Sequence, residues 1–223
     1  MILEEVGFMF SSVIRAVLLW LIIFIFGTFA GIIVAYSMRS YVFSAVVTQL
    51  FFIAGSLLVA GFLFRGREPS ILGFRAASPF YVFASLVFST VYAFLVACVA
   101  LRLPQASEFK TPLPGARQDT VVHLTLALFL APLGEETVFR GFLLGYMLES
   151  RVSSRVAVLM SALLFTMIHV IPFFQAPLVH KILVLSNAFI MSVAAGYLRT
   201  QTRSVLPAIA VHMGFNLGGL LAT

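Results

Sequence analysis

Long apolar stretches, separated by short polar segments, make up most of this chain. With a window of about 19 residues, hydropathy predicts membrane-spanning helices and hence an all-α transmembrane helix bundle. The fourth stretch, of about 30 residues, contains Pro132 and Gly134, which can kink a helix or break it in two. We therefore predict seven spans, or eight if the fourth one breaks. The predicted spans cover residues 13–36, 42–64, 80–101, 119–148, 156–171, 182–198 and 205–222.

The connections between these spans are too short to hold a soluble domain, so residues 1–223 are predicted to form a single membrane domain. The chain starts with acidic residues, Glu4 and Glu5, where a secretory signal peptide would carry Lys or Arg. The apolar run that follows is also too long for the core of a signal peptide. We expect the first span to stay in the protein as an anchor.

The composition supports this class of protein. Of the 223 residues, 61% are hydrophobic and 10% are charged, which is more apolar surface than a soluble fold can bury. The net charge of +6 comes mostly from Arg and Lys near the span ends, where cations bind lipid headgroups. We therefore predict a lipid bilayer, and no nucleic acid, as a partner. The single cysteine, Cys98, excludes an intramolecular disulfide and a paired-cysteine metal site.

The predicted spans contain three pairs of glycines, and the two members of each pair are four positions apart. This spacing favours close helix packing through small residues, although it is also common by chance in apolar helices. The pairs are Gly27 with Gly31, Gly141 with Gly145, and Gly214 with Gly218.

Charged side chains inside the fourth span indicate a functional site. Glu135 and Glu136 lie between apolar segments, and ionised groups at such depth cost several kcal/mol by insertion scales. Arg140 follows Glu136 by four residues, so the two share a helix face and can form a salt bridge. Glu135 points about 100° away from its neighbour, and remains as the unpaired carboxylate. We interpret it as a candidate general base.

Polar residues in two later spans extend this candidate site. His169 lies at the end of an apolar run, and His212 and Asn216 are four residues apart and project from one helix face. A lone histidine or asparagine in a membrane helix more often packs or joins helices than it catalyses. Their concentration in three late spans, with the first half of the chain nearly free of such residues, favours one shared site.

The three polar motifs resemble those of a known family. Glu135-Glu-Thr-Val-Phe-Arg140-Gly141 fits EExxxRG, Phe165-Thr-Met-Ile-His169 fits FxxxH, and His212-Met-Gly-Phe-Asn216 fits HxxxN. In this order and spacing they resemble the CPBP family of CAAX proteases and bacteriocin-processing proteins, also called the Abi family of intramembrane glutamic endopeptidases. Residues 119–220 would then form the catalytic core.

Two further segments resemble the family, and one position departs from it. Residues 72–75 between the second and third spans, and residues 196–210 before His212, also have a familial sequence. Ser192 stands where relatives often carry glycine, a difference that we expect to affect packing more than chemistry.

The resemblance implies an intramembrane endopeptidase that cleaves a membrane protein or peptide substrate. It implies that Glu135 and His169 activate a water molecule, while His212 and Asn216 stabilise the oxyanion. Glu136 and Arg140 would orient the helix and hold the first glutamate in place. The small size and basic loops further suggest a multi-pass protein of a bacterial inner membrane.

Three alternatives stay open at this stage. Glu135, His169 and His212 could bind zinc, but the HExxH motif is missing and the histidines come from separate helices, so we expect no cofactor. A bacteriocin self-immunity or membrane interaction protein would need the bundle without an ionised Glu135. A transporter would use the same carboxylates, but the inverted symmetry typical of transporters is not visible in the sequence.

Overall fold

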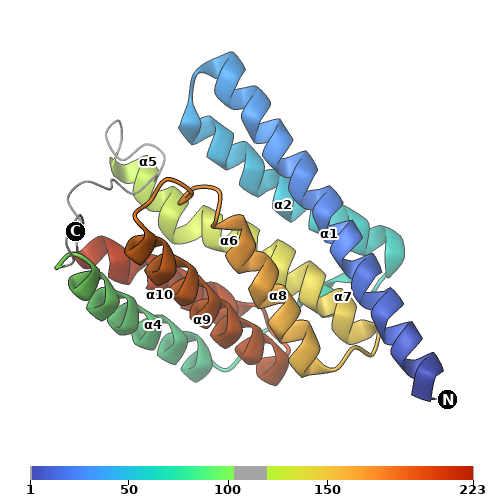
Figure 1. Ribbon diagram of the computed structural model, residues 1–223. Coiled ribbons are helices and arrows are strands. Elements are labelled where there is room, and N and C mark those ends of the chain that lie inside the picture. Colours follow the sequence, from blue (N-terminus) through green and yellow to red (C-terminus); the bar gives the residue numbers. More distant parts are fainter. Residues whose placement is uncertain (1, 103–119, 223) are drawn as a thin grey trace.

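Helices form nearly all of the computed structural model, which describes residues 2–102 and 120–222 (Figure 1). Within these residues there is no β-strand. Two of the helical segments, η1 and η2, are π-helices. The helices are α1 (Ile2–Met38), α2 (Tyr41–Leu63), α3 (Glu68–Leu72), α4 (Pro79–Ala100), α5 (Thr120–Thr125), η1 (Leu126–Leu130), α6 (Ala131–Glu136), η2 (Thr137–Leu143), α7 (Leu144–Glu149), α8 (Ser154–Ile168), α9 (Leu178–Thr202) and α10 (Leu206–Ala222).

Five of these helical runs are long and apolar enough to cross a bilayer: residues 7–38, 41–63, 79–100, 121–149 and 178–202. Two shorter apolar helices, α8 and α10, have 15 and 17 residues. The chain is thus a multi-pass, all-α membrane protein, as the hydropathy pattern predicts. The number of seven spans stays a prediction, because it depends on whether the two shorter helices also cross.

The fourth predicted span is one unbroken helical run from α5 to α7, despite its proline and glycine. The turn that precedes Pro132 is π-helical, with the N–H of Ala131 bonded to the carbonyl of Leu126. A widened turn gives room to the proline ring, which in a regular α-helix presses on the carbonyl one turn before it. The helix therefore passes Pro132 without breaking, and no eighth span arises from a break there.

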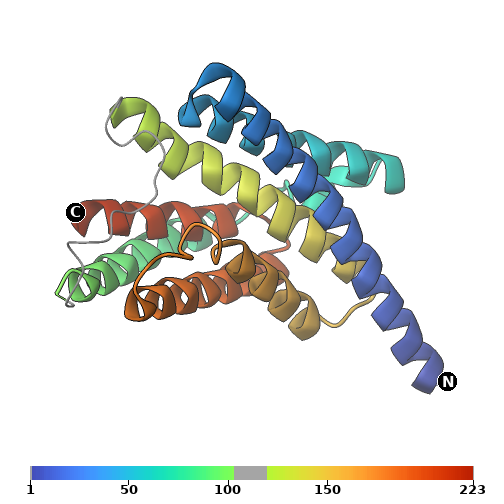
Figure 2. The same cartoon turned by 45° about the horizontal axis from the view of Figure 1, so that its top comes forward.

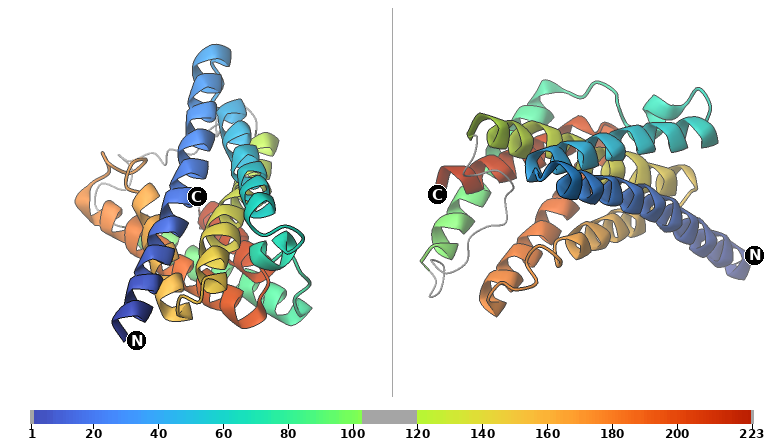
Figure 3. Two further views of the ribbon diagram at one scale, coloured as in Figure 1. Left: turned by 90° about the vertical axis from the view of Figure 1, so that its right-hand side faces the viewer. Right: turned by 90° about the horizontal axis from the view of Figure 1, so that it is seen from above.

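This central run lies between two groups of helices (Figures 1 and 2). The hairpin of α1 and α2 packs on one side of it, against α6 and η2. On the other side, α10 packs along α4 and α9, and α8 packs along α9. Helix α1 also extends past the rest of the bundle at its N-terminal end (Figure 3). The central helix, which carries the predicted glutamates, is therefore the most enclosed element.

An aromatic cluster joins the hairpin to the central run. Trp20 stacks on Phe24 and contacts Phe139 of η2, with ring centroids 5.3 and 5.4 Å away, and Phe24 stacks on Phe52 of α2. Trp20, Phe52 and Phe139 are buried. Aromatic rings bury large areas and favour such offset or tilted contacts, so this cluster fixes the hairpin against the helix that carries the site.

The prediction of close packing at the three glycine pairs is confirmed. A Cβ at Gly31 would lie 2.1 Å from Thr48 Oγ1 of α2, and one at Gly218 would lie 2.2 Å from the Thr90 carbonyl of α4. At Gly145, a Cβ would lie 2.2 Å from the Ile71 carbonyl of α3. Any larger residue would push the neighbouring helix away, so these positions set the spacing of three helix contacts.

The segment after α3 links the first half of the chain to the last two helices. Arg199, buried in the last turn of α9, donates a 2.8 Å hydrogen bond from Nη2 to the carbonyl of Ile71. The carbonyl of Gly73 accepts a hydrogen bond from the backbone N–H of Val205. Gly73 has φ +74° and its Cα faces the Arg199 guanidinium, so a side chain there would be strained and would clash.

Candidate active site

The central helix carries a fully buried ion pair. Arg140 Nη1 donates to Glu136 Oε1 across 2.8 Å, and neither side chain is exposed to solvent. The salt bridge predicted from the four-residue spacing is therefore present. Because an unpaired charge is costly inside a membrane protein, each of the two groups supplies the counter-charge that the other needs when buried.

Two further contacts hold the Arg140 guanidinium. Its Nη2 donates to Ser192 Oγ of α9, and its Cζ lies 4.5 Å from the ring centroid of Phe165 on α8. A guanidinium over an aromatic face is attracted by the ring quadrupole, more strongly when both are desolvated. Ser192 thus contacts a charged residue of the predicted site, so the expectation that it affects mainly packing is wrong in this respect.

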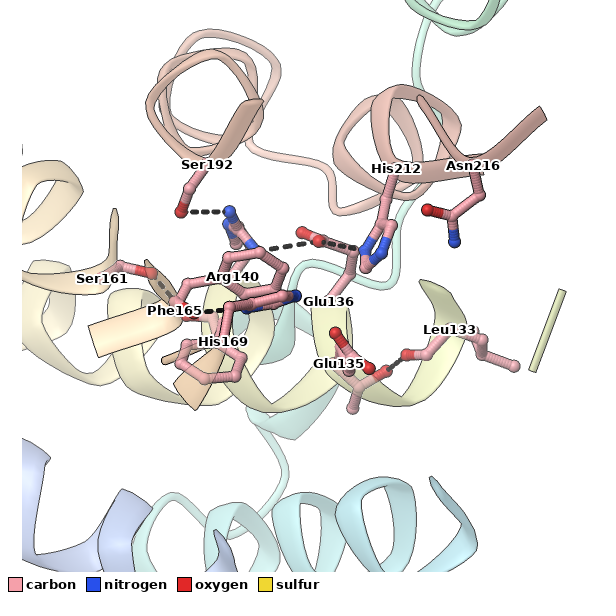
Figure 4. A network of polar contacts seen from close by, with 12 residues as sticks. Leu133, Glu135, Glu136, Arg140, Ser161, Phe165, His169, Ser192, His212 and Asn216 are labelled. Carbon is pink, nitrogen blue, oxygen red and sulfur yellow. Dashed lines mark hydrogen bonds and ion pairs between the residues drawn. The ribbon is translucent and has the colours of Figure 1, made fainter. Parts of the chain in front are cut away.

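His212 is joined to the second glutamate of the pair. Its Nδ1 lies 2.9 Å from Glu136 Oε1, the same oxygen that Arg140 uses (Figure 4). A carboxylate oxygen only accepts, so the imidazole must carry its hydrogen on Nδ1. Its Nε2 then bears a lone pair in neutral imidazole, or an N–H in imidazolium.

His169 is fixed in the same way by a backbone carbonyl. It is the residue that ends α8, and its Nδ1 lies 2.8 Å from the carbonyl oxygen of Phe165, one turn earlier. Because a carbonyl only accepts, Nδ1 carries the hydrogen and Nε2 of the neutral ring is available as a base. The ring of Phe165 lies 4.7 Å from that of His169 and 5.7 Å from that of His212, so both histidines flank one phenyl group.

Asn216 contacts the central helix at its π-helical turn. Its Nδ2 donates a 2.7 Å hydrogen bond to the carbonyl of Ala127. In a π-helix this carbonyl would pair with the N–H five residues later, but residue 132 is proline and has none. The amide of Asn216 supplies the missing donor. Since the carbonyl only accepts, this contact also orients the amide and leaves its second N–H for another acceptor.

Glu135 leaves α6 in a different direction from Glu136 (Figure 4). Its side chain is half-buried, and its Oε1 accepts a 3.4 Å hydrogen bond from Nε2 of Gln49 on α2. It has no salt bridge within the described part of the chain. The structure thus separates the two adjacent carboxylates: one is locked in an ion pair, and the other has only a neutral partner.

The contacts connect some of the predicted site residues directly and leave others apart. Glu136, Arg140 and His212 form one hydrogen-bonded network, whereas Glu135, His169 and Asn216 are held by other groups. Two contributors were missed by sequence reasoning. Gln49 could have been found as a carboxamide inside an apolar span, and Phe165 as the aromatic member of FxxxH.

Among the described residues, no three His, Cys, Asp or Glu side chains lie close enough together to hold a metal ion. This includes the candidate zinc ligands Glu135, His169 and His212. Whether the protein uses a cofactor stays a matter for experiment.

Comparison with known families agrees with the motifs. Residues 117–218 match the family model described as type II CAAX prenyl endopeptidase, Rce1-like. This part of the chain is therefore similar to the CAAX protease family, in agreement with the resemblance of the three motifs. No curated protein and no solved structure matches the chain at a significant level.

The family match covers the helices from α5 to most of α10, and with them every predicted site residue. It supports a membrane-embedded, CAAX-protease-like peptidase, a hydrolase that acts on a protein or peptide. Helices α1 to α4 lie outside the match, including residues 72–75, where the sequence also resembles the family.

Proposed function

We propose that this protein is an intramembrane endopeptidase of the glutamic type, which hydrolyses a peptide bond with a water molecule activated by Glu135 and His169. The observation that supports this most is the contrast between the two glutamates. Glu136 is bound by two cationic or potentially cationic groups, whereas among the described residues Glu135 has an amide donor and no salt bridge, and it is half-buried. A carboxylate without a counter-charge in a site of low dielectric is a competent base.

In the proposed reaction the water oxygen attacks the carbonyl carbon of the scissile bond, and its proton passes to Glu135 or to Nε2 of His169. The C–N bond then breaks, and the same group returns the proton to the leaving amine. The products are a carboxylate and a free amine. The lone pair on Nε2 of His169 is consistent with this role, since its Nδ1 already donates to a carbonyl.

The tetrahedral oxyanion would be stabilised by His212 and Asn216. His212 can donate from Nε2 in its imidazolium form, while its Nδ1 donates to the Glu136 carboxylate. Asn216 has one amide hydrogen on Ala127, which leaves the second for the oxyanion. Donors held in place before the reaction contribute roughly 3 to 4 kcal/mol each to lowering a barrier of this kind.

The substrate would be a membrane-associated protein or peptide tail. The description of the matching family makes a prenylated C-terminal CAAX peptide the first substrate to test. A bacterial inner membrane remains our proposed location. A non-catalytic role in bacteriocin immunity or membrane interaction is the competing proposal.

The test is cleavage of an internally quenched, farnesylated CAAX peptide by the purified protein in lipid nanodiscs, with the unprenylated peptide for comparison. Wild type should cleave, and Glu135→Gln should reduce the rate by at least a thousandfold while inserting normally. The membrane proteomes of cells expressing each protein should then differ in new peptide ends. Equal rates in wild type and variant would exclude Glu135 as the base. Identical peptide ends and no peptide cleavage would favour the immunity role.

A further inference from the structure

Gln49 is a polar side chain in the middle of an apolar helix. It lies in α2, within the span Tyr41–Leu63, and only 7% of it is exposed. A primary amide has two N–H donors and an acceptor oxygen, and burying these groups without partners costs several kcal/mol. The residue also lies outside residues 117–218, so the family match assigns it no role.

Among the described residues, the side-chain hydrogen bond of Gln49 is made to the predicted base, Glu135. Its Nε2 donates to Glu135 Oε1 at 3.4 Å, which joins two residues that are 86 positions apart in the chain. Its Oε1 is buried and has no hydrogen-bond partner within the described residues. The Gln49 amide thus uses its N–H group to bind the carboxylate, while its oxygen accepts no hydrogen bond from the described residues.

Gly134 makes this approach possible. A Cβ at Gly134 would lie 2.2 Å from Gln49 Oε1, 3.0 Å from its Cβ and 3.1 Å from its Cδ. A side chain at position 134 would collide with the Gln49 amide, so glycine there lets this amide lie against α6 beside Glu135. The contact therefore depends on two residues of different helices. Gln49 is a polar residue within an apolar span, and Gly134 is a glycine inside a helix.

We propose that Gln49 is a positioning residue for Glu135, held in place by Gly134, and that it supports both protonation states of the base. Nε2 donates while Glu135 is a carboxylate. Once Glu135 has taken a proton from water, a half-turn of the amide presents Oε1 as an acceptor for the carboxylic acid. A neutral amide can serve both forms, whereas a Lys or Arg would favour the carboxylate alone. This inference rests on the proposed function.

The unused acceptor supports this role over a purely structural one. A residue retained only to join α2 and α6 would be expected to use both ends of its amide. An apolar side chain of similar volume would also remove the buried, unpaired Oε1, which offsets part of the cost of removing the donor to the half-buried Glu135. Replacing Gln49 should therefore affect the reaction rather than the fold.

The experiment compares Gln49→Met, which keeps the length of the side chain, with wild type in the quenched-peptide assay. We expect kcat to fall roughly tenfold, as the loss of one hydrogen bond to a charged group predicts, with KM within twofold and an unchanged melting temperature. Ser56→Ala is the matched control, because Ser56 lies seven residues further along α2 and its buried Oγ also has no partner among the described residues. This control should keep the wild-type kcat.

A second pair of variants tests the same contact from the other helix. Gly134→Ala should displace the amide and lower kcat to a similar extent. In Gln49→Ala the amide is gone and only the Cβ of residue 49 remains, 3.0 Å from the added Cβ, so adding Gly134→Ala should cost little further activity. The inference would be overturned by a kcat within twofold of wild type in both Gln49→Met and Gly134→Ala. It would also be overturned by additive losses of activity in the double variant Gln49→Ala with Gly134→Ala. Either result would leave the proposed function intact. A wild type that cleaves neither peptide nor membrane protein would overturn the proposed function and this inference with it.

Discussion

Nδ1 of His212 and Oε1 of Glu136 lie 2.9 Å apart, although the two residues are 76 positions apart in the chain. The glutamate that also pairs with Arg140 thus holds the histidine of the last helix, while its neighbour Glu135 contacts α2. The EExxxRG motif therefore contains two carboxylates with separate tasks. In the proposed function, the second one organises the site and the first one is the base.

Glu136→Gln should destabilise the protein where Glu135→Gln does not. The substitution keeps the shape of the side chain but leaves the buried Arg140 guanidinium without a counter-charge, which costs about 3 to 5 kcal/mol. We expect a lower melting temperature and folded yield, together with lower activity, because His212 loses its carboxylate. Thermal unfolding in nanodiscs would measure this. Equal melting temperatures for the two variants would contradict the separation of tasks.

Arg140→Lys should not rescue the ion pair. The guanidinium reaches Glu136 with one nitrogen and Ser192 with another while it lies over Phe165, and a single ammonium group cannot make all three contacts. We expect a loss of about 2 kcal/mol or more in unfolding free energy. The control Ser192→Ala removes one of these hydrogen bonds and should cost about 1 kcal/mol. A fully stable lysine variant would show that charge alone suffices.

Pro132→Ala should lower activity without lowering stability. Alanine restores an N–H that competes with Asn216 for the carbonyl of Ala127, so the amide loses its fixed orientation. Since a proline within a helix costs about 3 kcal/mol, its removal should leave the melting temperature unchanged or higher. We expect kcat to fall roughly tenfold.

Pro207→Ala is the matched control for that substitution, because Pro207 lies in the first turn of α10, where its missing N–H has no intrahelical partner to lose. It should keep full activity. Full activity in Pro132→Ala as well would mean that Asn216 needs no help from the π-helical turn.

Chelation should leave the peptidase active. The candidate zinc ligands do not form a cluster within the described residues, so we expect 1,10-phenanthroline to change the cleavage rate by less than twofold. Inactivation that added zinc reverses would instead favour a metallopeptidase.

Hydropathy and glycine spacing predicted much of this fold. Each predicted span coincides with a helix, and the three glycine pairs lie at close helix contacts. The hydropathy pattern could not decide whether the fourth span breaks at Pro132. The π-helical turn that accommodates the proline ring depends on backbone hydrogen bonds, which cannot be inferred from residue types.

Local spacing also predicted the part of the site that lies on one helix. The separation of four positions between Glu136 and Arg140 is enough to infer their salt bridge, since both lie on one face. Contacts across 76 or 86 positions, such as those of His212 and Gln49, depend on how the helices are arranged. The sequence also gave no reason to link Ser192 with Arg140, because serine in a membrane helix commonly serves packing alone.

The docking of the first helices has a consequence for the boundaries of the functional unit. Gln49 lies on Gly134, and the Ile71 carbonyl accepts from Arg199, so both contacts cross from outside the family-matched segment to inside it. A fragment limited to residues 117–218 would leave the buried Arg199 guanidinium without the Ile71 carbonyl and Glu135 without its amide donor. The smallest fragment of the chain that keeps these contacts is therefore larger than the segment that matches the family model.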